Sequence, residues 1–163
     1  MPANIFSIAY LVTNLSSIFI LVAAIKWPGL ARFLLSSLFF VAALYNVDTI
    51  MRAPQSYLVL GGLAVFPVYE DFIFGAFKNN ITTFVLSIAF LQLFTSFAIA
   101  ARGELMKVGL TIAIVFLLAI APLGAGAAFP SSVILAIAAV ILLFKAKRLS
   151  IHHVLYPVRH LLN

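Results

Sequence analysis

The feature that most constrains this chain is a series of six long apolar runs separated by short polar breaks. A helix needs about 20 largely apolar residues to cross the hydrocarbon core of a bilayer. Inside lipid every backbone N–H and C=O must be paired within the structure, so runs of this kind fold as helices. The six predicted spans cover residues 5–25, 32–51, 57–77, 81–101, 105–123 and 131–144.

Composition supports this interpretation. The 163 residues are 65% hydrophobic and 9% charged, whereas soluble domains are about 45–50% apolar and about 25% charged. A soluble protein, a nucleic-acid binder and a disordered tail are therefore excluded, in spite of the net charge of +6. The runs do not alternate polar and apolar residues, which argues against a membrane β-barrel. We predict an all-α, polytopic transmembrane helix bundle.

The chain divides into a transmembrane bundle, residues 1–147, and a cytoplasmic tail, residues 148–163. Six spans place both termini on one side together with seven of the ten Lys and Arg residues. Because cytoplasmic loops carry an excess of these residues, we predict that both termini are cytoplasmic. In an alternative with five spans, residues 124–130 form a re-entrant break. The hairpin interpretation of that Gly- and Ala-rich stretch is the one we favour.

Two adjacent carboxylates in the third run, Glu70 and Asp71, are the most informative polar residues. Ionisable groups inside lipid are costly and usually mark a functional site. Pro67 lies just before them and would free a backbone carbonyl by kinking the helix. A cation, proton or headgroup site is one interpretation. In the alternative, the third helix begins earlier and the two carboxylates lie at the membrane interface.

Other polar residues could complete such a pocket. Asn14 and Gln92 lie near the middle of the first and fourth runs, and Tyr45 lies near the end of the second. Polar side chains at this depth usually join helices through hydrogen bonds, which is the structural alternative. Asp48 precedes Arg52 by four residues, so it forms either an interfacial ion pair or the polar mouth of the pocket.

The C-terminal tail carries apolar residues at helical spacing, with charged residues opposite them. This pattern is typical of a helix that lies on the membrane surface. Lys145, Lys147 and Arg148 are predicted to contact anionic lipid headgroups. Three histidines in the tail could bind a metal, although a headgroup-facing role is the interpretation we favour. The predicted partners are the lipid bilayer, a second copy of the chain or a membrane partner subunit, and no nucleic acid.

The chain has no cysteine, which excludes disulfides, thiolate nucleophiles and Cys-ligated metals. It contains no recognisable nucleophile, metal set or cofactor motif. We therefore predict no catalytic residue, no metal site and no cofactor.

Three short stretches give the chain a resemblance to a known family. They are GELMKVGL at 103–110, IAPLG at 120–124 and AFP at 128–130. Together they resemble the closing half of DoxX-like proteins, which are short four-helix bacterial inner-membrane proteins of often redox-linked function. The resemblance implies a bacterial inner-membrane location and carries over no catalytic residue.

Three functions remain open at this point. The first is a membrane protein that binds or passes a small solute, a proton or a lipid headgroup at a polar pocket around Glu70 and Asp71. The second is a non-catalytic accessory or scaffold subunit. The third is a small lipid-modifying enzyme that uses buried carboxylates for acid–base chemistry.

Overall fold

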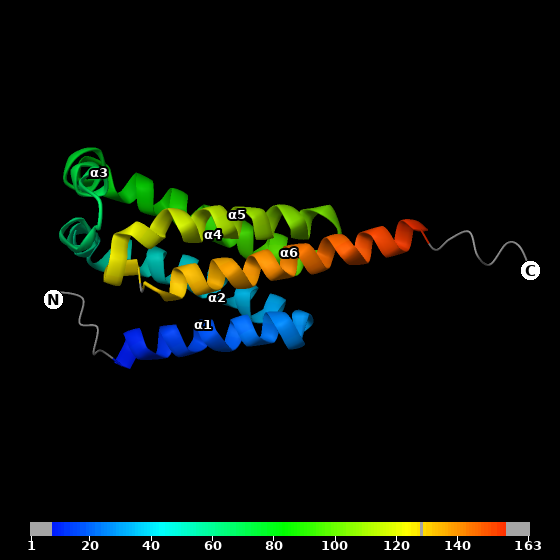
Figure 1. The fold of residues 1–163 in the computed structure, drawn as a ribbon. Coiled ribbons are helices and arrows are strands. Elements are labelled where there is room, and N and C mark those ends of the chain that lie inside the picture. Colours follow the sequence, from blue (N-terminus) through cyan, green and yellow to red (C-terminus); the bar gives the residue numbers. More distant parts are fainter. Residues whose placement is uncertain (1–7, 128, 156–163) are drawn as a thin grey trace, which may run out of the picture.

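A computed structural model describes the backbone of residues 8–127 and 129–155, and the side chains of residues 8, 10–127 and 129–146. Every element in these ranges is helical, which confirms the all-α prediction. Five long helices run back and forth between the two ends of a bundle, each reversing the direction of the one before (Figure 1). They are α1 (Ile8–Lys26), α2 (Pro28–Arg52), α4 (Ile81–Ala100), α5 (Glu104–Ile120) and α6 (Ser131–Leu155).

Three helical stretches in the described part of the chain are long and apolar enough to cross a membrane. They are Pro28–Arg52, Ile81–Ala100 and Glu104–Ala127, and shorter apolar helices cover Tyr10–Lys26 and Ser131–Ala146. Many of the large apolar side chains on these helices are exposed on the outside of the bundle, as in Phe33, Phe90 and Phe97. The structure therefore supports a transmembrane protein.

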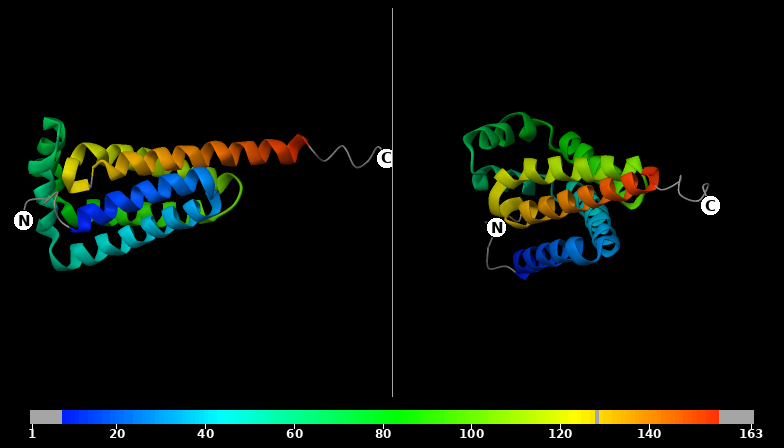
Figure 2. Two further views of the ribbon diagram at one scale, coloured as in Figure 1. Left: turned by 60° about the horizontal axis from the view of Figure 1, so that its bottom comes forward. Right: turned by 45° about the vertical axis from the view of Figure 1, so that its right-hand side comes forward.

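The predicted third span, residues 57–77, is not one helix. Its residues form a 3-10 helix, η1 (Pro54–Leu63), a short α3 (Pro67–Phe72) and a π-helical turn, η2 (Ile73–Phe77). These three elements lie across one end of the bundle, roughly perpendicular to the long helices (Figure 2). We call residues 54–77 the cap and this end of the bundle the cap end.

Proline explains why this run breaks. Pro67 has no N–H to donate, and it forces the residue before it out of the helical region. Phe66 is accordingly extended, with φ −112° and ψ 135°, and Pro67 then begins α3. Pro54 begins η1 in the same way. The sequence prediction of a kinked but continuous helix was wrong. The helix η1 ends at Leu63, and α3 begins as a separate helix at Pro67.

The cap has its own small core. Buried Ile50 from α2, Ile73 and Phe77 from η2, and Ile81 and Val85 from α4 form one cluster. Aromatic rings dominate its edge, where Phe72, Phe77 and Phe84 contact one another with ring centroids 5.3–6.1 Å apart.

The bundle has a different core, in which small residues alternate with large apolar ones such as Leu35, Phe39 and Leu110. Ala23 and Ala24 of α1, Ala31 of α2, Ala113 of α5, and Ala138 and Ala139 of α6 are fully buried. Gly109 brings α5 onto α4 so closely that a Cβ at this position would lie 2.7 Å from the Ile99 amide nitrogen. Small residues at such contacts let helix backbones approach closely, as membrane helices do.

The turn between α5 and α6 is a hairpin, as the Gly- and Ala-rich sequence predicted. The backbone leaves α5 through a 3-10 turn, η3 (Ala121–Ala127), in which Gly124 has a positive φ of 63°. A side chain at this position would strain the backbone and would meet the Leu63 carbonyl oxygen. The amide of Val65 donates to the Pro122 carbonyl (2.8 Å), so η3 also anchors the cap.

The start of α1 lies at the cap end, whereas α6 ends at the opposite end (Figure 1). The turns from α1 to α2 and from α4 to α5 also lie at that opposite end (Figure 2). We call it the basic end, because Lys26, Arg32, Arg102 and Lys145 lie there. The predicted arrangement with both termini on one side required six crossings, and the structure does not confirm six.

Candidate functional site

Glu70 and Asp71 lie in the cap, on α3, and both side chains are exposed. Neither carboxylate is inside the bundle. α3 is fixed to the bundle by the Tyr69 hydroxyl, which donates to the Ala119 carbonyl (2.9 Å). The structure therefore contains no buried pair of these two carboxylates, and the single helix from residue 53 to 71 that the interfacial alternative required is also not formed.

Gln92 is buried in the interface between α2 and α4, where it belongs to a polar network. The Asn46 amide donates to Gln92 Oε1 (2.7 Å). The Tyr57 hydroxyl donates to Asn46 Oδ1 (2.7 Å). The network joins the cap to α2 and α2 to α4, because Tyr57 belongs to η1.

The Tyr57 hydroxyl is held as a donor. Burial raises the pKa of Tyr57 above its ordinary value of 10.0, and the repulsion of Tyr45 acts in the same direction, against a hydrogen bond with Thr49 that lowers it. The phenol is therefore protonated at neutral pH. Tyr57 also contacts the Phe77 ring edge-on, with centroids 6.4 Å apart, so its ring is oriented by the core of the cap.

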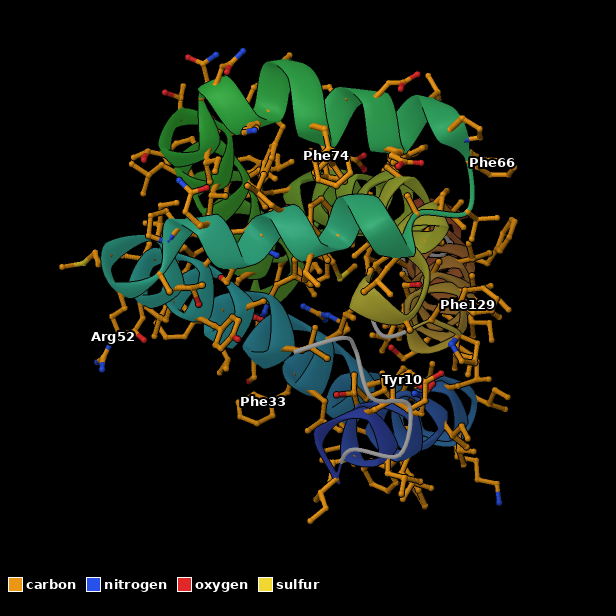
Figure 3. The ribbon with its side chains drawn as sticks, turned by 90° about the vertical axis from the view of Figure 1, so that its left-hand side faces the viewer. Tyr10, Phe33, Arg52, Phe66, Phe74 and Phe129 are labelled. Carbon is orange, nitrogen blue, oxygen red and sulfur yellow. The ribbon has the colours of Figure 1, made fainter. Side chains whose placement is uncertain are left out.

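Asn14 lies on α1, which packs against α2 and α6. Its amide donates to the Tyr10 carbonyl one turn earlier (3.0 Å). Its Oδ1 atom is buried and makes no hydrogen bond. The neighbouring Tyr10 hydroxyl donates to the Phe129 carbonyl, so the start of α1 is tied to the turn that precedes α6 (Figure 3).

Tyr45 and Asp48 are exposed near the end of α2. Asp48 accepts a hydrogen bond from Arg52 Nε at 2.7 Å, which is the interfacial ion pair expected from their spacing. Arg52 projects outward from the edge of the cap end (Figure 3). An exposed pair of this kind contributes little to stability, about 0–1 kcal/mol.

The residues predicted to share one pocket are therefore distributed over four places. Glu70 and Asp71 are on the cap surface, Gln92 is in the interface of α2 and α4, Asn14 is on α1, and Tyr45 and Asp48 are at the exposed end of α2. The structure brings Gln92 together with Asn46 and Tyr57 instead. These two were not predicted as site residues, although both lie at ends of apolar runs where a polar side chain can reach a neighbouring helix.

The opposite end of the bundle holds a second set of polar contacts that the sequence did not reveal. Arg32 Nη2 lies within hydrogen-bond distance of three carbonyls that end α4, those of Ile99 (3.2 Å), Ala100 (3.3 Å) and Ala101 (2.7 Å). The last carbonyls of a helix have no partner within it and carry partial negative charge. One arginine of α2 thus caps the end of α4.

Lys145 does the same for α1. Its Nζ donates to the carbonyls of Ala24 (2.9 Å) and Ile25 (2.5 Å), which end that helix. Lys145 was predicted to contact lipid headgroups, but its ammonium is engaged with the protein. The side chains of Lys147 and Arg148 and the histidines of the tail lie outside the described residues, although the backbone of α6 continues as one helix to Leu155.

Between these ends, α2 and α4 are joined by a reciprocal pair of serines. Ser36 Oγ donates to the Ser96 carbonyl (2.9 Å), and Ser96 Oγ donates to the Ser36 carbonyl (2.8 Å). Arg32, this pair and the Asn46–Gln92 bond thus join α2 to α4 at several levels. Polar side chains along this interface connect helices, which agrees with the structural alternative for Gln92.

A shallow polar depression of about 320 Å³ lies at the cap end, between the starts of η1 and α4. Among the described residues, no group of three His, Cys, Asp or Glu side chains could hold a metal ion. The depression is lined by Pro54, Gln55, Lys78, Asn79, Asn80, Ile81, Thr82 and Thr83.

No protein-family model matches the chain, and no match was found among curated proteins or solved structures. The resemblance to DoxX-like proteins therefore stays a prediction.

Proposed function

We propose that this chain is a five-span membrane protein that serves as a non-catalytic accessory or scaffold subunit, with the cap outside and the end of α6 in the cytoplasm. The spans are α1, α2, α4, α5 and α6, and the cap lies at the outer interface. Following the family resemblance, we propose the bacterial inner membrane as its location.

The distribution of charge supports this topology. The only Lys and Arg residues of the whole sequence that fall in the cap or next to it are Arg52 and Lys78, and the other eight of the ten belong to the basic end or the tail beyond it. Because cytoplasmic segments carry the excess of Lys and Arg, the basic end is assigned to the cytoplasm. Three of the four acidic residues, Asp48, Glu70 and Asp71, lie at the cap end.

The carrying observation for a scaffold is the interior of the bundle, where buried alanines pack with large apolar side chains such as Leu35, Phe39 and Leu110 in one cluster. The buried polar side chain that was the best candidate for a pocket, Gln92, is hydrogen-bonded to Asn46. The two carboxylates that could have carried protons are exposed on the cap. A close-packed bundle with large apolar outer faces is suited to holding lipid and protein partners.

The topology can be tested directly because the natural chain lacks cysteine. We expect an impermeant maleimide to label Gln55→Cys and Asn79→Cys in intact cells, and Gly29→Cys only after permeabilisation. Six spans with cytoplasmic termini predict the opposite result for Gln55→Cys and Gly29→Cys. Labelling in that opposite pattern would refute the five-span topology.

The scaffold role is tested by photo-crosslinking in the membrane. A photoreactive residue at Phe90 on α4 and another at Val115 on α5 probe two exposed faces of the bundle. We expect one face to give a discrete protein adduct and the other to give lipid adducts alone. Lipid adducts alone from both faces would contradict the scaffold proposal, and proteoliposomes that conduct protons would favour a conduit.

Binding of a small polar solute is a second candidate, and the Tyr57–Asn46–Gln92 network favours it. This network is the one set of polar side chains among the described residues that joins the cap, α2 and α4. If it recognises a solute, the double variant Asn46→Leu and Gln92→Leu should fold and lose solute binding. A folded double variant with unchanged binding would remove this network from any such function.

A further inference from the structure

The basic end of the bundle combines two kinds of cation. Arg32 and Lys145 are partly buried and donate to carbonyls that end α4 and α1. Each helix end carries about half a negative charge, so these two side chains neutralise groups that would repel an anion. Lys26 and Arg102, in contrast, are exposed.

Lys26 and Arg102 are also without an acidic partner. Of the two ion pairs in the described part of the chain, one joins Arg52 to Asp48 and the other joins Lys107 to Glu104. Among the described residues, neither Lys26 nor Arg102 thus forms an ion pair, and the nearby Glu104 at the start of α5 is bound to Lys107.

Both exposed cations follow directly after a capped carbonyl. Lys145 donates to the carbonyl of Ile25, which precedes Lys26. Arg32 donates to the carbonyl of Ala101, which precedes Arg102. The capping bonds thus fix the two turns, α1–α2 and α4–α5, from which the exposed cations project. These two turns lie at the same end of the bundle (Figure 2).

The surroundings of this end are those of a membrane interface. Trp27 follows Lys26 and is half exposed, and tryptophan is enriched where headgroups meet acyl chains. The surface next to it is apolar and exposed, at Ile25, Leu30 and Phe33. A ligand at this place meets cations at one edge and an apolar surface at the other, as a phospholipid does and a soluble anion does not.

We propose that the phosphate of an anionic phospholipid binds at the basic end, between the α1–α2 and α4–α5 turns. Lys26 and Arg102 contact the phosphate, and Trp27 lies against the glycerol and upper acyl chain. Arg32 and Lys145 are positioning residues that remove the negative ends of α4 and α1. The proposal rests on the topology above, which places this end at the cytoplasmic leaflet, and it needs no contribution from the C-terminal tail.

The test uses the purified full-length protein in a neutral detergent, titrated with phosphatidylglycerol or phosphatidylcholine. Binding is followed by the fluorescence of Trp27, the single tryptophan, and by lipid retained in native mass spectrometry. We expect wild type to prefer phosphatidylglycerol. Since each cation near an anionic headgroup contributes on the order of 1 kcal/mol, Lys26→Gln with Arg102→Gln should weaken this binding about tenfold or more.

A matched control removes two cations from the other end, with Arg52→Gln and Lys78→Gln. It has the same net charge as the first double variant, and it should bind phosphatidylglycerol like wild type. Lys26→Arg with Arg102→Lys keeps both charges and should also bind, which separates charge loss from misfolding. An equal loss in both double Gln variants would overturn the proposed site.

Glycerol 3-phosphate and inorganic phosphate form the last arm of the test. Binding of either with the affinity of the phospholipid would overturn the assignment to lipid. The maleimide labelling pattern is a separate readout. A wrong labelling pattern refutes the topology, whereas the expected pattern with no preference for phosphatidylglycerol refutes the lipid site alone.

Discussion

The two ends of this bundle differ in how the ends of their helices are covered. At the basic end, the unpaired carbonyls of α4 and α1 are capped by single cations from neighbouring helices, Arg32 and Lys145. At the cap end, a layer of chain lies across the helices and packs through the rings of Phe72, Phe77 and Phe84. A helix end near lipid can thus be completed by one long cationic side chain or by a layer of interfacial chain.

The bundle and the cap also differ in how well their close contacts can accommodate a larger side chain. In the bundle, helices approach through fully buried alanines and Gly109, so backbone touches backbone. In the cap, the close approach at Gly61 is against the end of the Phe74 ring, which can rotate, and the backbone approach is confined to Leu63 against Gly124. We expect the bundle to be the less forgiving region, and the variants below are ordered by the size of the expected effect.

The largest effect should come from Arg32→Met. Removing the guanidinium leaves the last carbonyls of α4 without a donor, and charged hydrogen bonds contribute about 1.5–3 kcal/mol each. We expect the free energy of unfolding in detergent to fall by about 3 kcal/mol, with partial recovery in Arg32→Lys. The control, Arg52→Met, removes an exposed pair and should change stability by about 0–1 kcal/mol. Equal losses in both would mean that capping does not distinguish the two ends.

Gly109→Ala should destabilise the bundle by about 1–3 kcal/mol, the range for overpacking a close contact. The new Cβ would meet the backbone of Ala98 and Ile99, which cannot move independently of α4. Gly61→Ala should cost less because the Phe74 ring can rotate, and Gly75→Ala, with open space around it, should be neutral. Thermal unfolding of the three variants measures this order. A larger loss for Gly61→Ala would reverse our view of which region is rigid.

Asn46→Leu should cost about 1–3 kcal/mol, because it leaves the buried Gln92 without its partner. The double variant with Gln92→Leu should recover the part of this loss that comes from Gln92, whereas the Tyr57 hydroxyl still lacks the Asn46 acceptor. A double-mutant cycle on the free energy of unfolding measures the coupling. Strict additivity would show that the two amides are not bonded in the membrane.

Tyr57→Phe should have the smallest effect, about 1 kcal/mol, from one hydrogen bond between the cap and α2. Its pH dependence is more specific. Because the folded pKa of Tyr57 is raised above 10.0, the contribution of Tyr57 to stability is fully present below that pH and is lost as pH rises through the folded value. Wild type should therefore lose stability above pH 10 more steeply than Tyr57→Phe. Parallel pH profiles for the two proteins would contradict a raised pKa of Tyr57 in the folded state.

The sequence predicted the helices, most of their bounds and the α5–α6 hairpin, because apolar runs and Gly/Pro breaks are local signals. The prediction of a third span failed at Pro67. The apolar run is long enough to cross a membrane, but the extended residue before the proline separates it into two helical parts. The sequence prediction also failed at Arg32, whose partners are the carbonyls of a helix 67 residues later in the chain. Backbone acceptors have no sequence signature, so a capping arginine looks like any loop cation.

The same limit applies to the candidate site. Polar residues at depth were recognised one by one, but their pairing depends on helix register. In the pocket hypothesis Gln92 faces Asn14 and Glu70, whereas in the structure it bonds Asn46, as the alternative of a helix-joining hydrogen bond predicts. Asn46 lies two residues before Asp48, near the end of an apolar run where a polar residue is ordinary.

The break in the third apolar run at Pro67 has a consequence for the sides of the membrane that the two termini face. With one crossing fewer, the number of membrane crossings is five instead of six, which is odd instead of even. Under the proposed five-span topology, anything attached before α1 and anything attached after α6 face different compartments. Under that topology Pro54 and Pro67 act together, because each begins a separate helical element of the cap and so keeps residues 54–77 at one end of the bundle.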